Sequence, residues 1–258
     1  MKKMLAGCAL LLFLTGCSSD SDKEAGQAGS PLTPTYTLIF VDKSQSVSTN
    51  KAYIDQKYRQ AVTSIIDENI KDKGDKLEVY FIHENTAKGR ALSLTTRTEM
   101  DDIGQANATD REAAQTAFDL SLQRERTNMR QQVWSKLAQQ NTNTSNQQTD
   151  IWASLPVIAK AGESGAMVKV YYLSDMVESM KGTGRRDFHT NPPRDNAQAE
   201  QWAKADAEQL KRYTLGNPDI TMILPFEPNA SVRENNPAVT QYWQTLFNEL
   251  GANTVEEQ

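Results

Sequence analysis

Oxygen-bearing side chains follow directly on an apolar run near the amino-terminal end of the chain. Residues 36–41 read YTLIFV, the composition of a buried strand, and lead straight into Asp42-x-Ser44-x-Ser46. One carboxylate and two hydroxyls on such a turn are hard oxygen donors, which Mg²⁺ prefers. In open α/β sheets, ligands bind outside the carboxyl ends of the strands. This turn is therefore a candidate metal site.

Two later segments carry oxygen donors in comparable positions. Thr149 follows the polar run 141–148 and precedes an expected helix, and Asp175 comes just after the apolar run 168–173. Taken singly, each segment also suits a turn or a helix N-cap, because Asp, Ser and Thr accept hydrogen bonds from the first amides of a helix. Their joint occurrence favours a shared metal site; a purely structural remnant of such a site is the alternative.

The elements that must position these residues alternate along the chain. The segments expected to be helical are 51–71, 110–140, 151–161, 196–213 and 238–250. The runs expected to be strands are 36–41, 77–82, 90–95, 168–174 and 219–225. Strands that alternate with helices predict an α/β, Rossmann-like fold, an open and mostly parallel sheet with helices on both faces. No second linker interrupts residues 36–258, so we expect one domain there.

The amino terminus combines a basic start, an apolar run and a cysteine. A short basic start precedes the apolar run 4–14, which is too short for a membrane-spanning helix of about 20 residues. Residues 14–17, Leu-Thr-Gly-Cys, resemble a lipobox. We therefore predict a signal peptide over residues 1–16 and lipidation of Cys17. An ordinary signal peptide with a chance cysteine is the alternative.

Composition bears on location and partners. Residues 17–35, rich in Ser, Asp, Gly, Pro and Thr, predict a disordered, lipid-anchored tether. Ser18 after the lipidated cysteine resembles lipoproteins sorted to the outer membrane, so we expect a cell-envelope location with the membrane face left open. A net charge of −5 without a polybasic stretch argues against nucleic acid and against electrostatic membrane binding. Both cysteines lie in the first 17 residues, which leaves the rest without a disulfide.

The three oxygen-donor motifs, in this order and on these elements, resemble the metal-ion-dependent adhesion site (MIDAS) of von Willebrand factor A (VWA) domains. The resemblance covers about residues 36–251. It implies direct ligation of the metal by Ser44, Ser46 and Thr149. It also implies that Asp42 and Asp175 act through water or by hydrogen-bonding the ligands. The implied metal is Mg²⁺, with Mn²⁺ or Ca²⁺ as alternatives.

Two features depart from the family. Gln45 stands where the family often has glycine, which would alter access to the metal. The segment between the second strand and Thr149 is longer than is typical. The extra length predicts an elaborated helix beside the site.

The resemblance implies a binding protein rather than an enzyme. Two carboxylates on a divalent cation leave the site near neutral, with an open coordination position. In the family, an acidic side chain of a protein partner fills that position. The two histidines, His83 and His189, are expected at surface or supporting positions, and no catalytic motif accompanies them.

Two other functions also fit the sequence. A metal-independent scaffold would use the long helix 110–140 and the loop 180–190 as its contact surface. The basic run 182–186 within that loop is expected to be exposed at the rim of the site, where it would select an acidic partner. A Mg²⁺-dependent hydrolase that activates water is the third function. Chelator sensitivity separates the first two, and turnover would support the hydrolase.

Overall fold

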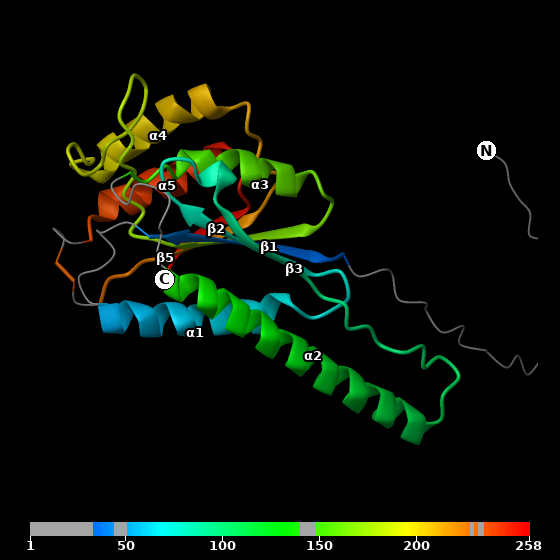
Figure 1. Ribbon diagram of the computed structural model, residues 1–258. Coiled ribbons are helices and arrows are strands. Elements are labelled where there is room, and N and C mark those ends of the chain that lie inside the picture. Colours follow the sequence, from blue (N-terminus) through cyan, green and yellow to red (C-terminus); the bar gives the residue numbers. More distant parts are fainter. Residues whose placement is uncertain (1–32, 44–50, 140–147, 228–229, 232–234) are drawn as a thin grey trace, which may run out of the picture. The chain divides into compact units, whose positions relative to one another are not determined.

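A computed structural model of the chain describes residues 33–43, 51–139, 148–227, 230–231 and 235–258 (Figure 1). The predicted ligands Ser44 and Ser46 and the predicted lipidation site Cys17 lie outside the described residues. Within the described ranges, no helix is both long enough and apolar enough to cross a membrane.

A six-stranded sheet forms the centre of the fold, with the strand order β3-β2-β1-β4-β5-β6. The strands are β1 (Thr35–Asp42), β2 (Lys76–Ile82), β3 (Arg90–Thr95), β4 (Met167–Leu173), β5 (Asp219–Ile223) and β6 (Thr254–Glu257). All neighbours are parallel except β2 and β3, which confirms the predicted mostly parallel α/β sheet. The sequence did not predict β6, because Val255 is the only apolar residue in this short strand.

Helices cover both faces of the sheet, as predicted. They are α1 (Lys51–Asn69), α2 (Ala108–Ala138), α3 (Leu155–Gly162), α4 (Asn196–Leu210) and α5 (Pro237–Glu249). Figure 1 shows α1 and α2 on one face and α3, α4 and α5 on the other. Pro156 lies in the first turn of α3, where its missing amide proton costs no hydrogen bond.

Strand β1 divides its side chains between two hydrophobic clusters. Leu38 and Phe40 join the cluster under α3, α4 and α5. Ile39 and Val41 join the cluster under α1 and α2. Successive side chains of a strand point to opposite faces, so a strand covered on both faces must be apolar throughout. This burial explains the unbroken apolar run that precedes Asp42.

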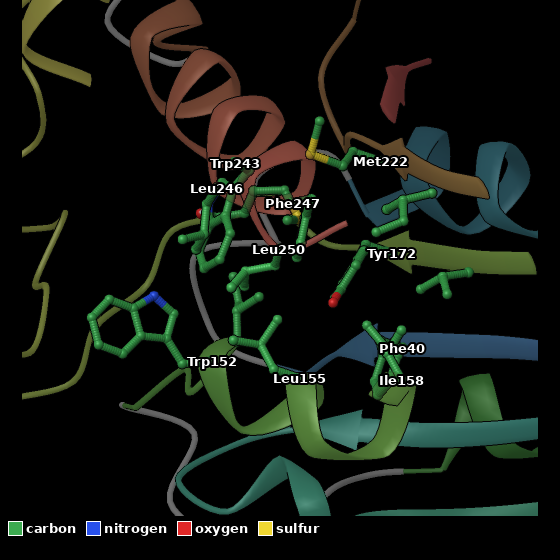
Figure 2. Close-up of a cluster of buried hydrophobic side chains, with 14 of the residues drawn as sticks. Phe40, Trp152, Leu155, Ile158, Tyr172, Met222, Trp243, Leu246, Phe247 and Leu250 are labelled. Carbon is green, nitrogen blue, oxygen red and sulfur yellow. The ribbon is translucent and has the colours of Figure 1, made fainter. Parts of the chain in front are cut away.

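Aromatic rings fill the cluster between the sheet and α5 (Figure 2). Phe40 stacks on Tyr172 with ring centroids 5.1 Å apart, and Tyr172 stacks on Phe247 at 5.6 Å. Trp243 stacks on Phe247 at 5.4 Å. Its indole Nε1 also donates a hydrogen bond to the backbone oxygen of Met176, at 2.7 Å. The core is thus tied directly to the segment that follows β4.

A buried glutamate joins β1, β2 and β3 near the end of the sheet where β1 begins. The Glu78 side chain on β2 is 1% exposed and forms an ion pair with Lys76 at 3.0 Å. It also accepts hydrogen bonds from the side chains of Tyr36, Tyr80, Arg90 and Ser93. Burial acts to raise the pKa of Glu78, but hydrogen bonds to the charged form outweigh burial and lower the pKa to about 2.

This lowered pKa predicts a loss of stability in acid. Ionised Glu78 stabilises the folded state above its unfolded pKa of 4.5, and this contribution is lost as the pH falls towards 2. Over that range, wild type is expected to lose up to about 3 kcal/mol more of its free energy of unfolding than Glu78→Gln. Urea denaturation at a series of pH values measures the difference. Parallel pH profiles for the two proteins would contradict this role of Glu78.

Candidate metal centre

The strand order creates a topological switch point between β1 and β4. The chain continues from β1 to β2 on one side and from β4 to β5 on the other, and such points are where open α/β sheets bind ligands. Asp42 is the last residue of β1, and Ser174 and Asp175 directly follow β4. Because Val41 pairs with Leu173 in parallel register, Asp42 and Ser174 stand side by side. The fold therefore brings the strand ends of two predicted motifs together.

The hydroxyl of Ser174 links the two motifs. It donates to Oδ2 of Asp42 at 2.8 Å and accepts a hydrogen bond from the amide of Met176 at 3.0 Å. Asp42 and Ser174 are both buried, at 4% and 0% exposed. Met176 has a φ of 61°, a left-handed conformation that costs a residue with a side chain about 1–2 kcal/mol and that clusters at functional sites. This turn directs the chain just after Asp175.

Thr149 lies between the ends of β2 and β4. Its amide donates to Oγ of Ser179 at 2.7 Å, and its carbonyl oxygen accepts from the amide of Ser179 at 3.0 Å. The next amide, of Asp150, donates to the carbonyl oxygen of His83 at 3.2 Å. Thr149 is buried at 2% exposed. Its backbone is thus fixed to the segment that follows Asp175 and to the residue that follows β2.

A buried phenol from α1 lies in the field of both carboxylates. Tyr58 is 6% exposed, and its hydroxyl has no hydrogen-bond partner among the described residues. Burial, reinforced by the negative charges of Asp42 and Asp175, raises the pKa of Tyr58 well above its ordinary value. A cation beside the carboxylates would offset this charge. Sequence patterns did not indicate that Tyr58 lies near these carboxylates, or that Ser174 binds Asp42.

A cavity of about 360 Å³ opens beside Asp42, between α1 and the carboxyl end of α2. Its charged lining consists of Asp42, Lys43, Lys51, Asp55 and Arg59. Lys43 is held away from the carboxylate, since its ammonium group donates to a backbone oxygen of α2, that of Leu137. Burial, together with the charge of Lys51, lowers the pKa of Lys43 to about 8. Among the described residues, this lining holds three basic and two acidic side chains.

Residues 182–184 of the basic run 182–186 are exposed, as predicted, but its two arginines form ion pairs within the protein. Arg185 and Arg186 are only 26% and 23% exposed. Arg185 pairs with Asp150, and Arg186 pairs with Asp206, each at 2.6 Å. Both charges are therefore neutralised inside the protein, which removes the expected basic rim that would select an acidic partner.

The described candidate ligands carry one kind of donor atom. Asp42, Asp175 and Thr149 offer only oxygen atoms, the ligand type of Mg²⁺, Mn²⁺ and Ca²⁺. Among the described residues, no group of three or more His, Cys, Asp or Glu side chains could hold a metal ion. The predicted set has only two carboxylates, and its serines, Ser44 and Ser46, lie outside those residues. The described residues thus supply a partial, all-oxygen donor set.

Comparison with known proteins gives structural neighbours only. No family model and no curated protein matches the chain. The pilus adhesin SpaC from Lactobacillus rhamnosus GG, in an open conformation, is 13% identical with a TM-score of 0.42, over 89% of this chain and 28% of that one. A von Willebrand factor type A structure from Catenulispora acidiphila is 12% identical with a TM-score of 0.35, over 84% and 41%.

A third structure is a pilin. The D319A mutant of the PilB minor pilin from Streptococcus sanguinis is 11% identical with a TM-score of 0.38, over 89% of this chain and 59% of that one. The chain thus spans less than two thirds of each of these proteins.

Proposed function

We propose that the chain is a lipid-anchored protein of the cell envelope that binds a protein partner through a divalent cation at the carboxyl ends of β1 and β4. The observation that carries this proposal is the pair of acidic motifs at the switch point, where the hydroxyl of Ser174 joins the end of β4 to Asp42 at 2.8 Å. Binding rather than catalysis is proposed on the resemblance of the three motifs to the adhesion site of VWA domains.

Each residue has a defined part in this proposal. Ser44, Ser46 and Thr149 would ligate the cation directly, while Asp42 and Asp175 would hold its water ligands. Mg²⁺ is the first choice of metal, with Mn²⁺ and Ca²⁺ as the other two, and when bound it supplies an open coordination position for a partner carboxylate. Ser174 would orient Asp42. The nearby cavity, with its basic excess, would receive groups next to that carboxylate on an acidic partner.

The proposed site lies at the end of β1 that is farther along the chain from the proposed anchor. The described part of the chain enters the sheet at Thr35, and β1 runs from there to Asp42. A chain lipidated at Cys17 would therefore join the sheet through the beginning of β1, on the periplasmic face or the surface face of the outer membrane.

The proposal predicts stabilisation by metal. A ligand that binds only the folded state stabilises it by about 2.7 kcal/mol at a hundredfold excess over its Kd. We expect Mg²⁺ or Mn²⁺ to raise the unfolding temperature of the full chain in detergent, and EDTA to reverse the rise. An unchanged unfolding temperature at millimolar metal would contradict the proposal.

A metal-independent scaffold has one observation in its favour. The first buried residue of α2 is Leu122, so the amino-terminal half of this helix packs little against the domain. Leu120 in that half is 49% exposed. Partner binding that survives EDTA would favour this surface over the metal site.

A further inference from the structure

The segment after Asp175 folds back into a short hairpin, here called the clasp (residues 178–188). Ser179 and Asp187 form an antiparallel bridge. The amide of Phe188 donates to the carbonyl oxygen of Glu178 at 2.7 Å. The clasp begins three residues after Asp175, so it is covalently tied to one predicted arm of the metal site.

Hydrogen bonds join the clasp to the loop that contains Thr149, a predicted metal ligand. Besides the two bonds between Ser179 and Thr149, Oε2 of Glu178 accepts from the amide of Ile151 at 2.7 Å. The guanidinium of Arg185 bridges the two segments, since it donates to Oδ1 of Asp150 at 2.6 Å and to Oε1 of Glu178 at 2.5 Å. Thr149 is therefore held to the Asp175 segment by backbone bonds and by a buried ionic bridge.

We propose that Arg185 is a positioning residue of the metal site, which fixes Thr149 relative to Asp175 through Asp150 and Glu178. This inference rests on the proposed function. The hydrogen bonds of Arg185 go to Asp150 and Glu178. Arg185 acts through the two carboxylates that it joins.

The charges explain why one arginine controls the geometry. The side chains of Glu178 and Asp150 are 0% and 9% exposed, and Arg185 is the cation that both share. The guanidinium also lies over the ring of Trp152, 4.9 Å from its centroid. Burial raises the pKa of Glu178 to about 8 even beside Arg185. Without Arg185, Glu178 and Asp150 would lose the side chain that joins them, and removal of one partner of a buried pair is strongly destabilising. The loop and the clasp would then move apart.

Even a small movement of Thr149 relative to Asp175 would weaken metal binding. Mg²⁺ demands near-ideal octahedral geometry, so a displaced threonine is a poor ligand. Residues that orient the ligands of a metal typically contribute about 10- to 100-fold to its affinity. We therefore expect the loss of Arg185 to weaken metal binding by about this factor.

Arg186 is a matched control on the same hairpin. It makes two hydrogen bonds to Asp206 on α4, at 2.6 and 2.8 Å, and it lies 4.6 Å from the ring centroid of Trp202. Arg185 and Arg186 thus share charge, partial burial, a buried carboxylate and a tryptophan. They differ in that Arg186 fastens the clasp to α4 and not to the Thr149 loop.

The test compares Arg185→Met, Arg186→Met and wild type as full chains in detergent. Titration calorimetry with Mn²⁺ is expected to show affinity weakened by about 10- to 100-fold in R185M and within about twofold of wild type in R186M. Arg185→Lys, which keeps the charge, should lie between wild type and R185M, and it replaces R185M if that variant fails to fold. Equal affinity in wild type and R185M, or an equal loss in R186M, would overturn the inference.

Hydrogen exchange without metal separates this inference from the proposed function. The amides of Thr149 and Ile151 donate to side chains of the clasp. Their exchange rates should therefore rise at least about tenfold in R185M and stay at the wild-type values in R186M. Absence of Mn²⁺ binding to wild type would overturn the proposed function, and it would also overturn the role of Arg185 at a metal site. Unchanged exchange in R185M would overturn the positioning role alone.

Discussion

Replacement of Trp243 by alanine is expected to lower the free energy of unfolding by about 3–5 kcal/mol. The side chain is fully buried, at 0% exposed, and it packs on Tyr242, Phe247 and Phe188. The truncation would leave a cavity in the aromatic cluster of Figure 2. It would also leave the backbone oxygen of Met176 without its indole donor. Both losses destabilise the folded state.

Urea denaturation of three variants separates these two losses. Trp243→Phe keeps an aromatic ring but not the N–H group, so it should lower the free energy of unfolding by about 1–3 kcal/mol. Leu120→Ala is the surface control, because Leu120 is 49% exposed, and it should change that free energy by no more than about 0.5 kcal/mol. A loss below about 1 kcal/mol in W243A would contradict the central place of this residue in the core.

Asp42→Asn is expected to weaken metal binding by at least about 10- to 100-fold. The substitution keeps the shape of the side chain and an oxygen for the hydroxyl of Ser174, which lies 2.8 Å from Oδ2 of Asp42. It removes the negative charge that would hold the water ligands of the cation. The fold should therefore survive while the affinity falls.

Asp55→Asn is the matched control for that variant. Asp55 lines the same cavity as Asp42, but its carboxylate is exposed and pairs with Lys51 at 3.1 Å on the surface of α1. Calorimetry with Mn²⁺ should give D55N an affinity within about threefold of wild type, because exposed charges are screened. Equal affinities in D42N and wild type would mean that the metal lies elsewhere.

Most of the fold could be predicted because the strongest signals in the sequence are local. The apolar run of β1 reports burial on both faces of a sheet, and Pro156 marks the first turn of α3. Strand β6 could not be predicted, since it has one apolar residue, Val255, and is held by pairing with β5. Its stability comes from a neighbour that is distant in sequence.

In the candidate site, only the positions of residues that directly follow strands could be predicted from the sequence. Asp42 and Asp175 follow apolar runs, so a parallel sheet places them at one edge. The contact of Arg185 with Asp150 joins residues 35 positions apart, and no local pattern reveals it. Composition alone therefore indicated free basic charges in a loop where the structure pairs both arginines with carboxylates. The roles of Ser44, Ser46 and Cys17 stay predictions, since they lie outside the described residues.

Anomalous scattering from crystals grown with Mn²⁺ tests the central claim most directly. The account predicts one strong manganese peak at the carboxyl ends of β1 and β4, within coordination distance of Thr149, with Asp42 and Asp175 reaching it directly or through water. Soaking with EDTA should remove that peak. A peak elsewhere on the protein, or none at millimolar Mn²⁺, would contradict the metal site and direct the search for a partner to α2.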